Sequence, residues 1–327
     1  MKRSLIASKR LGFSFGLCQA GMLARALEDP EAGRVGEAFA QACKLSGSTE
    51  TLDEERVTNA GFLSFAFPPD EGGKPLRNRI VYGPTAFDNG GRLFAARAHE
   101  FLHALQYRKA VVLHTDPFNV NAPFFLCPED YVRRKELLEA DAYAKGAWLQ
   151  SLASVRHEEM SGALDKTPLS VGKFNELRAE AGSLQKTLEQ AAVAAGDNHG
   201  QWLGDGSLSA ARDLWHALAL EEYANIIKAR KEEGEKNFVF VRMTDDDAKE
   251  IGLSFGPNPF DNGVAPLQLS PANKKTLEKL NEELGITAAT ALPTIDEALA
   301  QKGMTRGGLI AAAYKSPAPP KAPKNSI

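Results

Sequence analysis

Residues 91–108 have the sequence GRLFAARAHEFLHALQYR. Apolar side chains recur in it at the three- and four-residue intervals of an α-helix with one face turned toward a core. Asp88 or Asn89 can cap the first turn, because either side chain accepts a hydrogen bond from a free backbone N–H group. We therefore predict an amphipathic helix over about 91–108, with an apolar stripe made of Phe94, Ala98, Phe101, Leu102 and Leu105.

The same segment contains the pattern HExxH, with its polar residues off the apolar stripe. Histidines four residues apart stand one above the other on a helix, so the imidazoles of His99 and His103 can reach a single ion. Glu100 is offset in angle and can address a water at that ion without binding it. The spacing predicts a metal site with Glu100 as general base. Two alternatives are an ordinary helix with two histidines and a metal site without catalysis.

A third metal ligand is expected from the next helix, since catalytic zinc usually has three protein ligands and an open position. Residues 135–144, KELLEADAYA, contain three carboxylates. At 100° per residue, Glu136, Glu139 and Tyr143 share one stripe, whereas Asp141 lies near the middle of the apolar arc. The helical wheel favours Asp141 as the inward carboxylate, but the residues alone leave all three acids open.

A helical HExxH followed by a helix with Glu-Ala-Asp-Ala resembles the zincin metallopeptidases, in particular the gluzincin branch. It looks most like uncharacterised bacterial metallopeptidase-like proteins with a downstream EADA element. The resemblance covers about residues 78–150. It implies zinc as cofactor, with His99, His103 and Glu139 as ligands and Glu100 as the general base.

The chain departs from the gluzincin pattern at one position. Several gluzincins carry an aspartate four residues after the ligand glutamate, where it holds a motif histidine, but here that position is Tyr143. We rank Glu139 first as third ligand, Asp141 second and Glu136 third. Whichever acid does not bind the metal is expected to accept a hydrogen bond from an imidazole N–H group.

Strand patterns precede the motif helix. Residues 62–67 (FLSFAF) and 79–82 (RIVY) are short aromatic or β-branched runs separated by the turn cluster 68–73, which predicts an antiparallel pair. Residues 110–113 (AVVL) are a possible third strand. The strand at 79–82 could offer its edge to an extended peptide. The candidates for an oxyanion donor are Tyr82, Tyr143 and His114, and the sequence does not choose among them.

Helical patterns occupy most of the remaining chain, so we predict an α+β fold that is predominantly helical, with a small antiparallel sheet and an active-site helix in a zincin-like core. Helices are expected within 1–60, from Cys127-Pro128 to about Trp148, and near 172–195, 208–232, 271–284 and 294–302, with a β-like segment at 238–242. The predicted regions are an N-terminal helical region (1–60), the metallopeptidase core (61–153), a mostly helical C-terminal region (154–313) and a Pro/Lys tail (314–327).

Composition and charge argue against several other classes of protein. With 39 basic and 42 acidic residues the net charge is −3, which gives no support for nucleic-acid binding. Three cysteines do not form a disulfide framework, and no apolar run reaches the length of a membrane span. Lys9 and Arg10 interrupt the N-terminal apolar stretch, which favours an amphipathic helix and a cytoplasmic protein over an exported one. His216 is expected to be a packing or surface residue, and Asp245–Asp247 a helix N-terminal acid cluster.

From these patterns we expect a zinc-dependent metallopeptidase, a hydrolase whose substrate is a peptide or protein. The competing hypothesis is an interaction or regulatory protein that keeps a structural or relic zinc site and has no hydrolytic activity.

Overall fold

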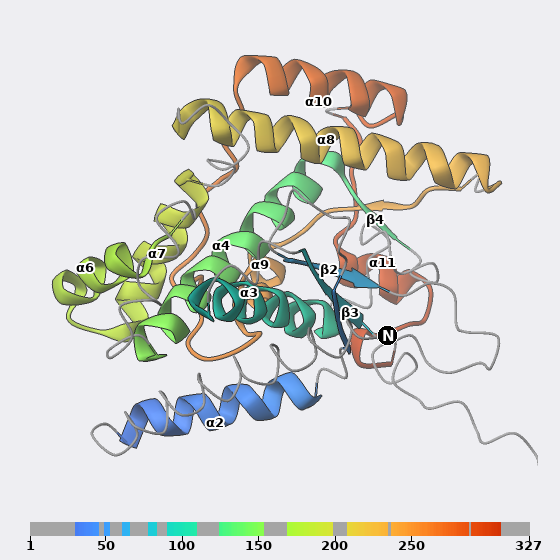
Figure 1. Cartoon of the computed structure of the whole chain (residues 1–327). Coiled ribbons are helices and arrows are strands. Elements are labelled where there is room, and N and C mark those ends of the chain that lie inside the picture. The colour runs from blue at the N-terminus through green and yellow to red at the C-terminus, as the bar shows by residue number, and fades with distance from the viewer. Residues whose placement is uncertain are drawn as a thin grey trace, which may run out of the picture.

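The long helix α4 (Pro128–Ala153) lies at the centre of the computed structural model, and α3, α7 and α8 pack against it (Figure 1). The sequence explains where α4 begins. Pro128 occupies the first position, where no backbone N–H group is needed, and Glu129 and Asp130 lie beside the positive end of the helix dipole. Most side chains of α4 are buried, so this helix is the scaffold that positions the others.

The structure describes residues 30–45, 49–52, 61–65, 78–83, 90–109, 124–153, 169–198, 208–234, 237–287 and 289–308. Within these residues the fold is predominantly helical, as predicted. The other helices are α2 (Pro30–Leu45), α3 (Gly90–Lys109), α6 (Val171–Ala181), α7 (Leu184–Asn198), α8 (Leu208–Glu232), α9 (Asp245–Gly252), α10 (Pro271–Glu283) and α11 (Ile295–Gln301). The strands are β1 (Thr49–Leu52), β2 (Gly61–Phe65), β3 (Asn78–Tyr82), β4 (Phe125–Leu126) and β5 (Phe240–Val241).

Helix α3 matches the helix predicted over 91–108, and every residue of the predicted apolar stripe is buried. The stripe packs in one hydrophobic cluster with Ile80 and Tyr82 of β3 and with Ala142 and Leu149 of α4. Burial of apolar surface of this kind contributes about 25 cal/mol per Å². This packing holds the polar face of α3 in a fixed position relative to α4.

The described strands β1, β2 and β3 form a mixed sheet in the order β1-β3-β2. Strand β2 runs antiparallel to β3, with Leu63 opposite Ile80, whereas β1 runs parallel to β3, with Thr51 opposite Val81. The antiparallel pair expected from 62–67 and 79–82 corresponds to β2 and β3, but the sheet is mixed, because β1 adds a parallel strand. The segment 1–60 is not helical throughout, because β1 lies inside it. The two threonines of β1 favour extended backbone, and β3 provides its hydrogen-bonding partner.

The central position of β3 overturns a second expectation. Both of its edges are paired, one with β1 and one with β2. The segment 79–82 therefore has no free edge to offer a peptide, because its backbone donors and acceptors are used within the sheet.

The segment predicted as one helix near 172–195 forms two. Helix α6 ends at Gly182, whose φ of 71° lies in the left-handed region that glycine adopts without strain, and α7 starts two residues later. The helices expected near 208–232, 271–284 and 294–302 are present as α8, α10 and α11. Thr244 caps α9 with a capping box, and Asp245–Asp247 form its first turn, as expected for a helix N-terminal acid cluster.

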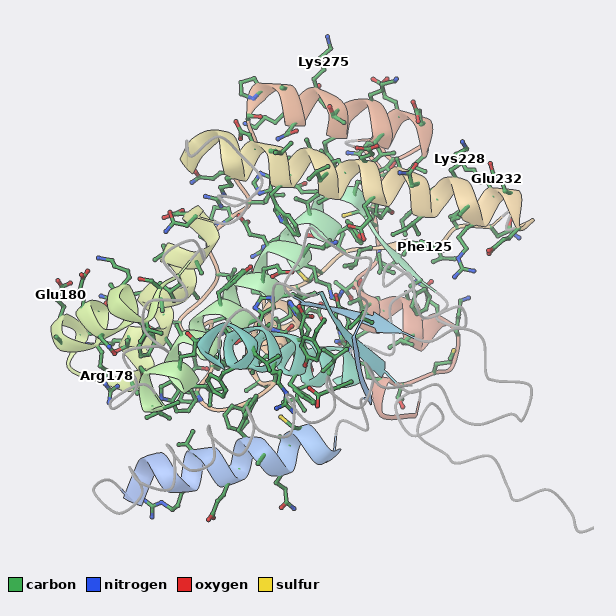
Figure 2. All side chains as sticks on the ribbon, viewed as in Figure 1. Phe125, Arg178, Glu180, Lys228, Glu232 and Lys275 are labelled. Carbon is green, nitrogen blue, oxygen red and sulfur yellow. The ribbon has the colours of Figure 1, made fainter. Side chains whose placement is uncertain are left out.

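Elements on both sides of residues 153/154 share one hydrophobic cluster. Helices α6, α7, α8 and α9 contact α4, and β4 pairs in parallel with β5, with Phe125 opposite Phe240. Figure 2 shows Lys228 and Glu232 on the far end of α8 and Lys275 on α10 pointing outward. These helices cover α4 with their apolar faces and present charges to the outside.

No helix in the part of the chain that the structure describes is both long and apolar enough to cross a membrane. Several sequence predictions lie outside the described residues: the N-terminal segment 1–29, the strand 110–113, the Pro/Lys tail 314–327, and the side chains of Asp88, Asn89 and His114.

Candidate metal centre

The contact between α3 and α4 brings two histidines and one glutamate together. Nε2 of His99 lies 3.2 Å from one carboxylate oxygen of Glu139, and Nε2 of His103 lies 3.4 Å from the other. The two Nε2 atoms are 3.0 Å apart. Among the residues that the structure describes, this is the one group of three potential metal-ligand side chains whose donor atoms converge. The structure therefore places Glu139, the first-ranked acid, beside both motif histidines.

The direction of the two helices explains this convergence. His99 and His103 are one helical turn apart, and their ring centroids are separated by 4.5 Å. Residues later in α4 contact residues earlier in α3. The guanidinium of Arg134 lies over the ring of Tyr107, the carboxylate of Glu139 lies beside both histidines, and the ring of Tyr143 lies tilted against that of His99. The antiparallel crossing thus presents one carboxylate of α4 to two imidazoles of α3.

The donor set fits zinc. Two ligand atoms that are each about 2.0–2.1 Å from a tetrahedral zinc ion are separated by about 3.3 Å. Here the two Nε2 atoms are 3.0 Å apart, and they lie 3.2 and 3.4 Å from the two different oxygens of the Glu139 carboxylate. With one ligand atom taken from each residue, the three atoms all lie within 4.8 Å of one another. Imidazole nitrogen and carboxylate oxygen are both common zinc ligands, and three protein ligands leave one position open. Within the described residues, these three side chains therefore fit a zinc ion that is bound by two histidines and one carboxylate.

In the metal-free protein, the charges of these side chains shift one another's pKa values. Burial disfavours the charged form of His103, but the charges of Glu139 and Glu100 outweigh burial and raise the His103 pKa to about 9. Burial also disfavours the Glu139 carboxylate, yet His103 and His99 hold its pKa well below the ordinary value. Glu139 is thus an anion and His103 carries a proton near pH 7, a proton that a metal must displace.

Glu100 is buried, with 6% of its surface exposed, although it carries a carboxyl group. Its charge contributes to the raised pKa of His103 and to that of Tyr143. Glu100 follows His99 on α3 and is offset in angle from both histidines of that helix.

Tyr143 is the phenol at this centre. Its ring centroid lies 4.4 Å from that of His99. Burial, followed by the charges of Glu139 and Glu100, raises its pKa well above the ordinary value, so the hydroxyl keeps its proton. Tyr82 is used elsewhere: its hydroxyl donates to Glu50 (2.7 Å), which Arg97 also binds at 2.6 and 2.7 Å. Of the predicted oxyanion donors within the described residues, Tyr143 is the one whose ring contacts a histidine of the HExxH motif.

Asp141 and Glu136 lie away from the histidine pair. Asp141 is fully buried, pairs with Lys145, and accepts hydrogen bonds from Gln106 and Ser254. It therefore occupies the inward position that the helical wheel indicates, but it contacts neither motif imidazole directly in these hydrogen bonds. Glu136 binds Arg212 at 2.7 Å and lies 3.4 Å from Nε2 of His216. His216 is fully buried, in agreement with a packing role.

Gln106 is a residue of this centre that the sequence patterns did not single out. Its Oε1 lies 2.8 Å from Nδ1 of His103, and its Nε2 donates to Asp141 at 2.8 Å. The available signal was its position three residues after His103, where helix side chains are neighbours. Lys145 carried a similar signal, because it is four residues after Asp141 and has the opposite charge.

No protein-family model matches this chain, and no curated protein and no solved structure shows significant similarity to it.

Proposed function

We propose that the protein is a zinc-dependent metallopeptidase in which His99, His103 and Glu139 hold the metal and Glu100 is the general base. The observation that carries this proposal is the convergence of two Nε2 atoms and one carboxylate within 3.0–3.4 Å of one another. It is supported by the HExxH spacing, which also supplies an acid beside the ligands. A zincin-like core around α3, α4 and the sheet belongs to the same proposal.

Zinc at this centre would lower the pKa of a bound water to about 7 and polarise a carbonyl oxygen. Glu100 accepts a proton from the attacking water and delivers it to the leaving amine. Tyr143 keeps its phenolic proton and can donate a hydrogen bond to the oxygen of the scissile carbonyl as negative charge develops there. His99, His103 and Glu139 hold their donor atoms converged, so the reacting groups need little rearrangement.

The test separates metal binding from chemistry. Glu100→Gln should retain one zinc per chain, because Glu100 is not a ligand, and should lower the rate of peptide cleavage by about 10²–10⁴-fold, the usual contribution of a general base. The substrate probe is a proteome-derived peptide library, with cleavage products identified by mass spectrometry. Glu136→Gln is the matched control: it changes an acid on α4 that binds Arg212 instead of the metal centre.

Two results would contradict the proposal. If Glu100→Gln cleaves peptides at the wild-type rate, Glu100 is not the general base. A wild-type protein that contains zinc but cleaves no library peptide would favour the interaction or regulatory protein with a relic zinc site.

A further inference from the structure

We propose that Gln106 is a positioning residue that holds His103 with its proton on Nδ1 and its Nε2 lone pair directed at the metal. This inference rests on the proposed metal centre and adds to it a residue outside the HExxH motif. Gln106 lies on α3, is 4% exposed, and bridges His103 to α4.

The orientation of the Gln106 amide follows from its neighbours on α4. Its nitrogen lies 2.9 Å from the carbonyl oxygen of Leu138 and 2.8 Å from Oδ2 of Asp141. Both neighbours are acceptors, so the group that faces them must be the NH₂ group. The opposite orientation would place the amide oxygen against two acceptor oxygens inside the core, with no hydrogen between them.

The acceptor role of Asp141 is itself determined by its surroundings. Nζ of Lys145 lies 2.6 Å from Oδ1 of Asp141, and the hydroxyl of Ser254 donates to Oδ2 at 2.9 Å. Lys145 also donates to the carbonyl oxygen of Gly252, at 2.6 Å. Two donors already reach the Asp141 carboxylate, so Gln106 is a third donor to it.

With its NH₂ group directed at α4, Gln106 presents Oε1 to His103 at 2.8 Å. An amide oxygen is only an acceptor, so Nδ1 of His103 must carry a hydrogen. In a neutral imidazole this leaves the lone pair on Nε2, the atom that faces His99 and Glu139. His99 differs, because no hydrogen-bond partner among the described residues reaches its buried Nδ1. The order of contacts thus runs from Ser254 and Lys145 through Asp141 and Gln106 to His103.

Gln106→Met tests the proposal, because methionine has a similar length but neither accepts from Nδ1 nor donates to Asp141. Zinc affinity, measured by competition with a chelator, should fall about 10–100-fold, as is typical when a partner of a metal ligand is lost. In metal-free protein, the ring proton on Nδ1 of His103 should be protected from exchange with solvent in the wild type. This protection, followed by ¹H–¹⁵N NMR, should be lost in the variant.

Gln185→Met is the matched control. Nε2 of Gln185 also donates to a carboxylate (Glu189, 2.8 Å) and to a backbone carbonyl (Asn258, 2.7 Å), but it lies on α7. This variant should remove two similar hydrogen bonds and leave zinc affinity and the His103 proton unchanged. An equal loss of affinity in both variants would indicate a general effect of lost stability and overturn the proposal.

The readouts distinguish this proposal from the proposed function. Wild-type zinc affinity in Gln106→Met overturns the positioning role even if the protein is a zinc peptidase. If the wild type binds no zinc, the proposed function fails, and the NMR signal alone decides whether Gln106 holds the proton on Nδ1: protection supports it, and its absence overturns it.

Discussion

Asp141 and Lys145 form an ion pair of 2.6 Å in which neither side chain is exposed to solvent. One turn of α4 separates them, and the pair lies between the metal centre and the turn that follows α9. Partners from α3 and from residues 252–254 complete its hydrogen bonds. A buried charge with a missing partner is costly, so this pair connects the stability of the core with the geometry of the centre.

The first prediction concerns that ion pair. Lys145→Met should lower the free energy of unfolding by about 3–5 kcal/mol, because it leaves the carboxylate of Asp141 buried without its counter-charge. The double change Lys145→Met with Asp141→Asn should lose less than the sum of the two single changes. Urea unfolding measures both. Lys173→Met breaks an exposed pair with Glu176 and should change stability by less than about 1 kcal/mol. A similar cost for Lys145→Met and Lys173→Met would contradict the prediction.

The second prediction separates the acids of α4. Glu139→Gln should weaken zinc binding far more than Glu136→Gln, because a neutral amide poorly replaces an anionic oxygen ligand, whereas Glu136 binds Arg212. Asp141→Asn should cost only the roughly 10–100-fold of an outer-shell change. Chelator competition measures all three. If Asp141→Asn loses the metal while Glu139→Gln retains it, the assignment of ligands is wrong.

The third prediction is a pH dependence. The His103 pKa is raised to about 9 in the metal-free protein, so below that pH zinc must displace a proton. Apparent zinc affinity should therefore rise about tenfold per pH unit from pH 7 toward 9 and level off above, and calorimetry in buffers of different ionisation heat should detect about one proton released at pH 7. Affinity that levels off near the ordinary histidine value of about 6.5 would refute it.

The raised pKa of His103 also makes the stability of the metal-free protein depend on pH. Because the His103 pKa is higher folded than unfolded, the stabilisation is fully present below the unfolded value of about 6.5 and is lost as the pH rises through about 9. For Glu139 the pKa is lowered on folding, so its contribution is present above the unfolded value and declines at acidic pH. Urea midpoints measured from pH 6 to 9.5 should fall in wild type and change less in His103→Gln.

A fourth prediction concerns Gly256, whose φ is 65°. A Cβ atom there would lie 2.7 Å from the ring of Trp148, so Gly256→Ala combines backbone strain with a clash against a large side chain of α4. Gly182→Ala is the control, because its φ is 71° and a Cβ atom there meets nothing within 4 Å. In thermal unfolding, Gly182→Ala should lower the free energy of unfolding by about 1–2 kcal/mol. Gly256→Ala should lower it by about 1–3 kcal/mol more than Gly182→Ala does. Equal losses would exclude the clash.

Interactions between residues close in sequence are enough to predict several features of this protein. The apolar period of residues 91–108 is enough to predict α3 and the face it buries, since a helix must hide such a stripe. The four-residue spacing of His99 and His103 brings their rings together on one helix whatever surrounds them. The start of α4 follows from Pro128 and the acids beside it.

Contacts between distant segments needed the tertiary structure. The wheel of α4 ranks its acids by burial, and it correctly put Asp141 inward, but only the crossing of α3 over α4 decides that Glu139 faces the histidines. Likewise, residues 49–52 form the strand β1 because they pair with β3. The partner strand is about 30 residues away in sequence, and no local pattern encodes that pairing. Gln106 joined the centre for the same reason: its role depends on two acceptors of another helix, and their positions exist only once the chain is folded.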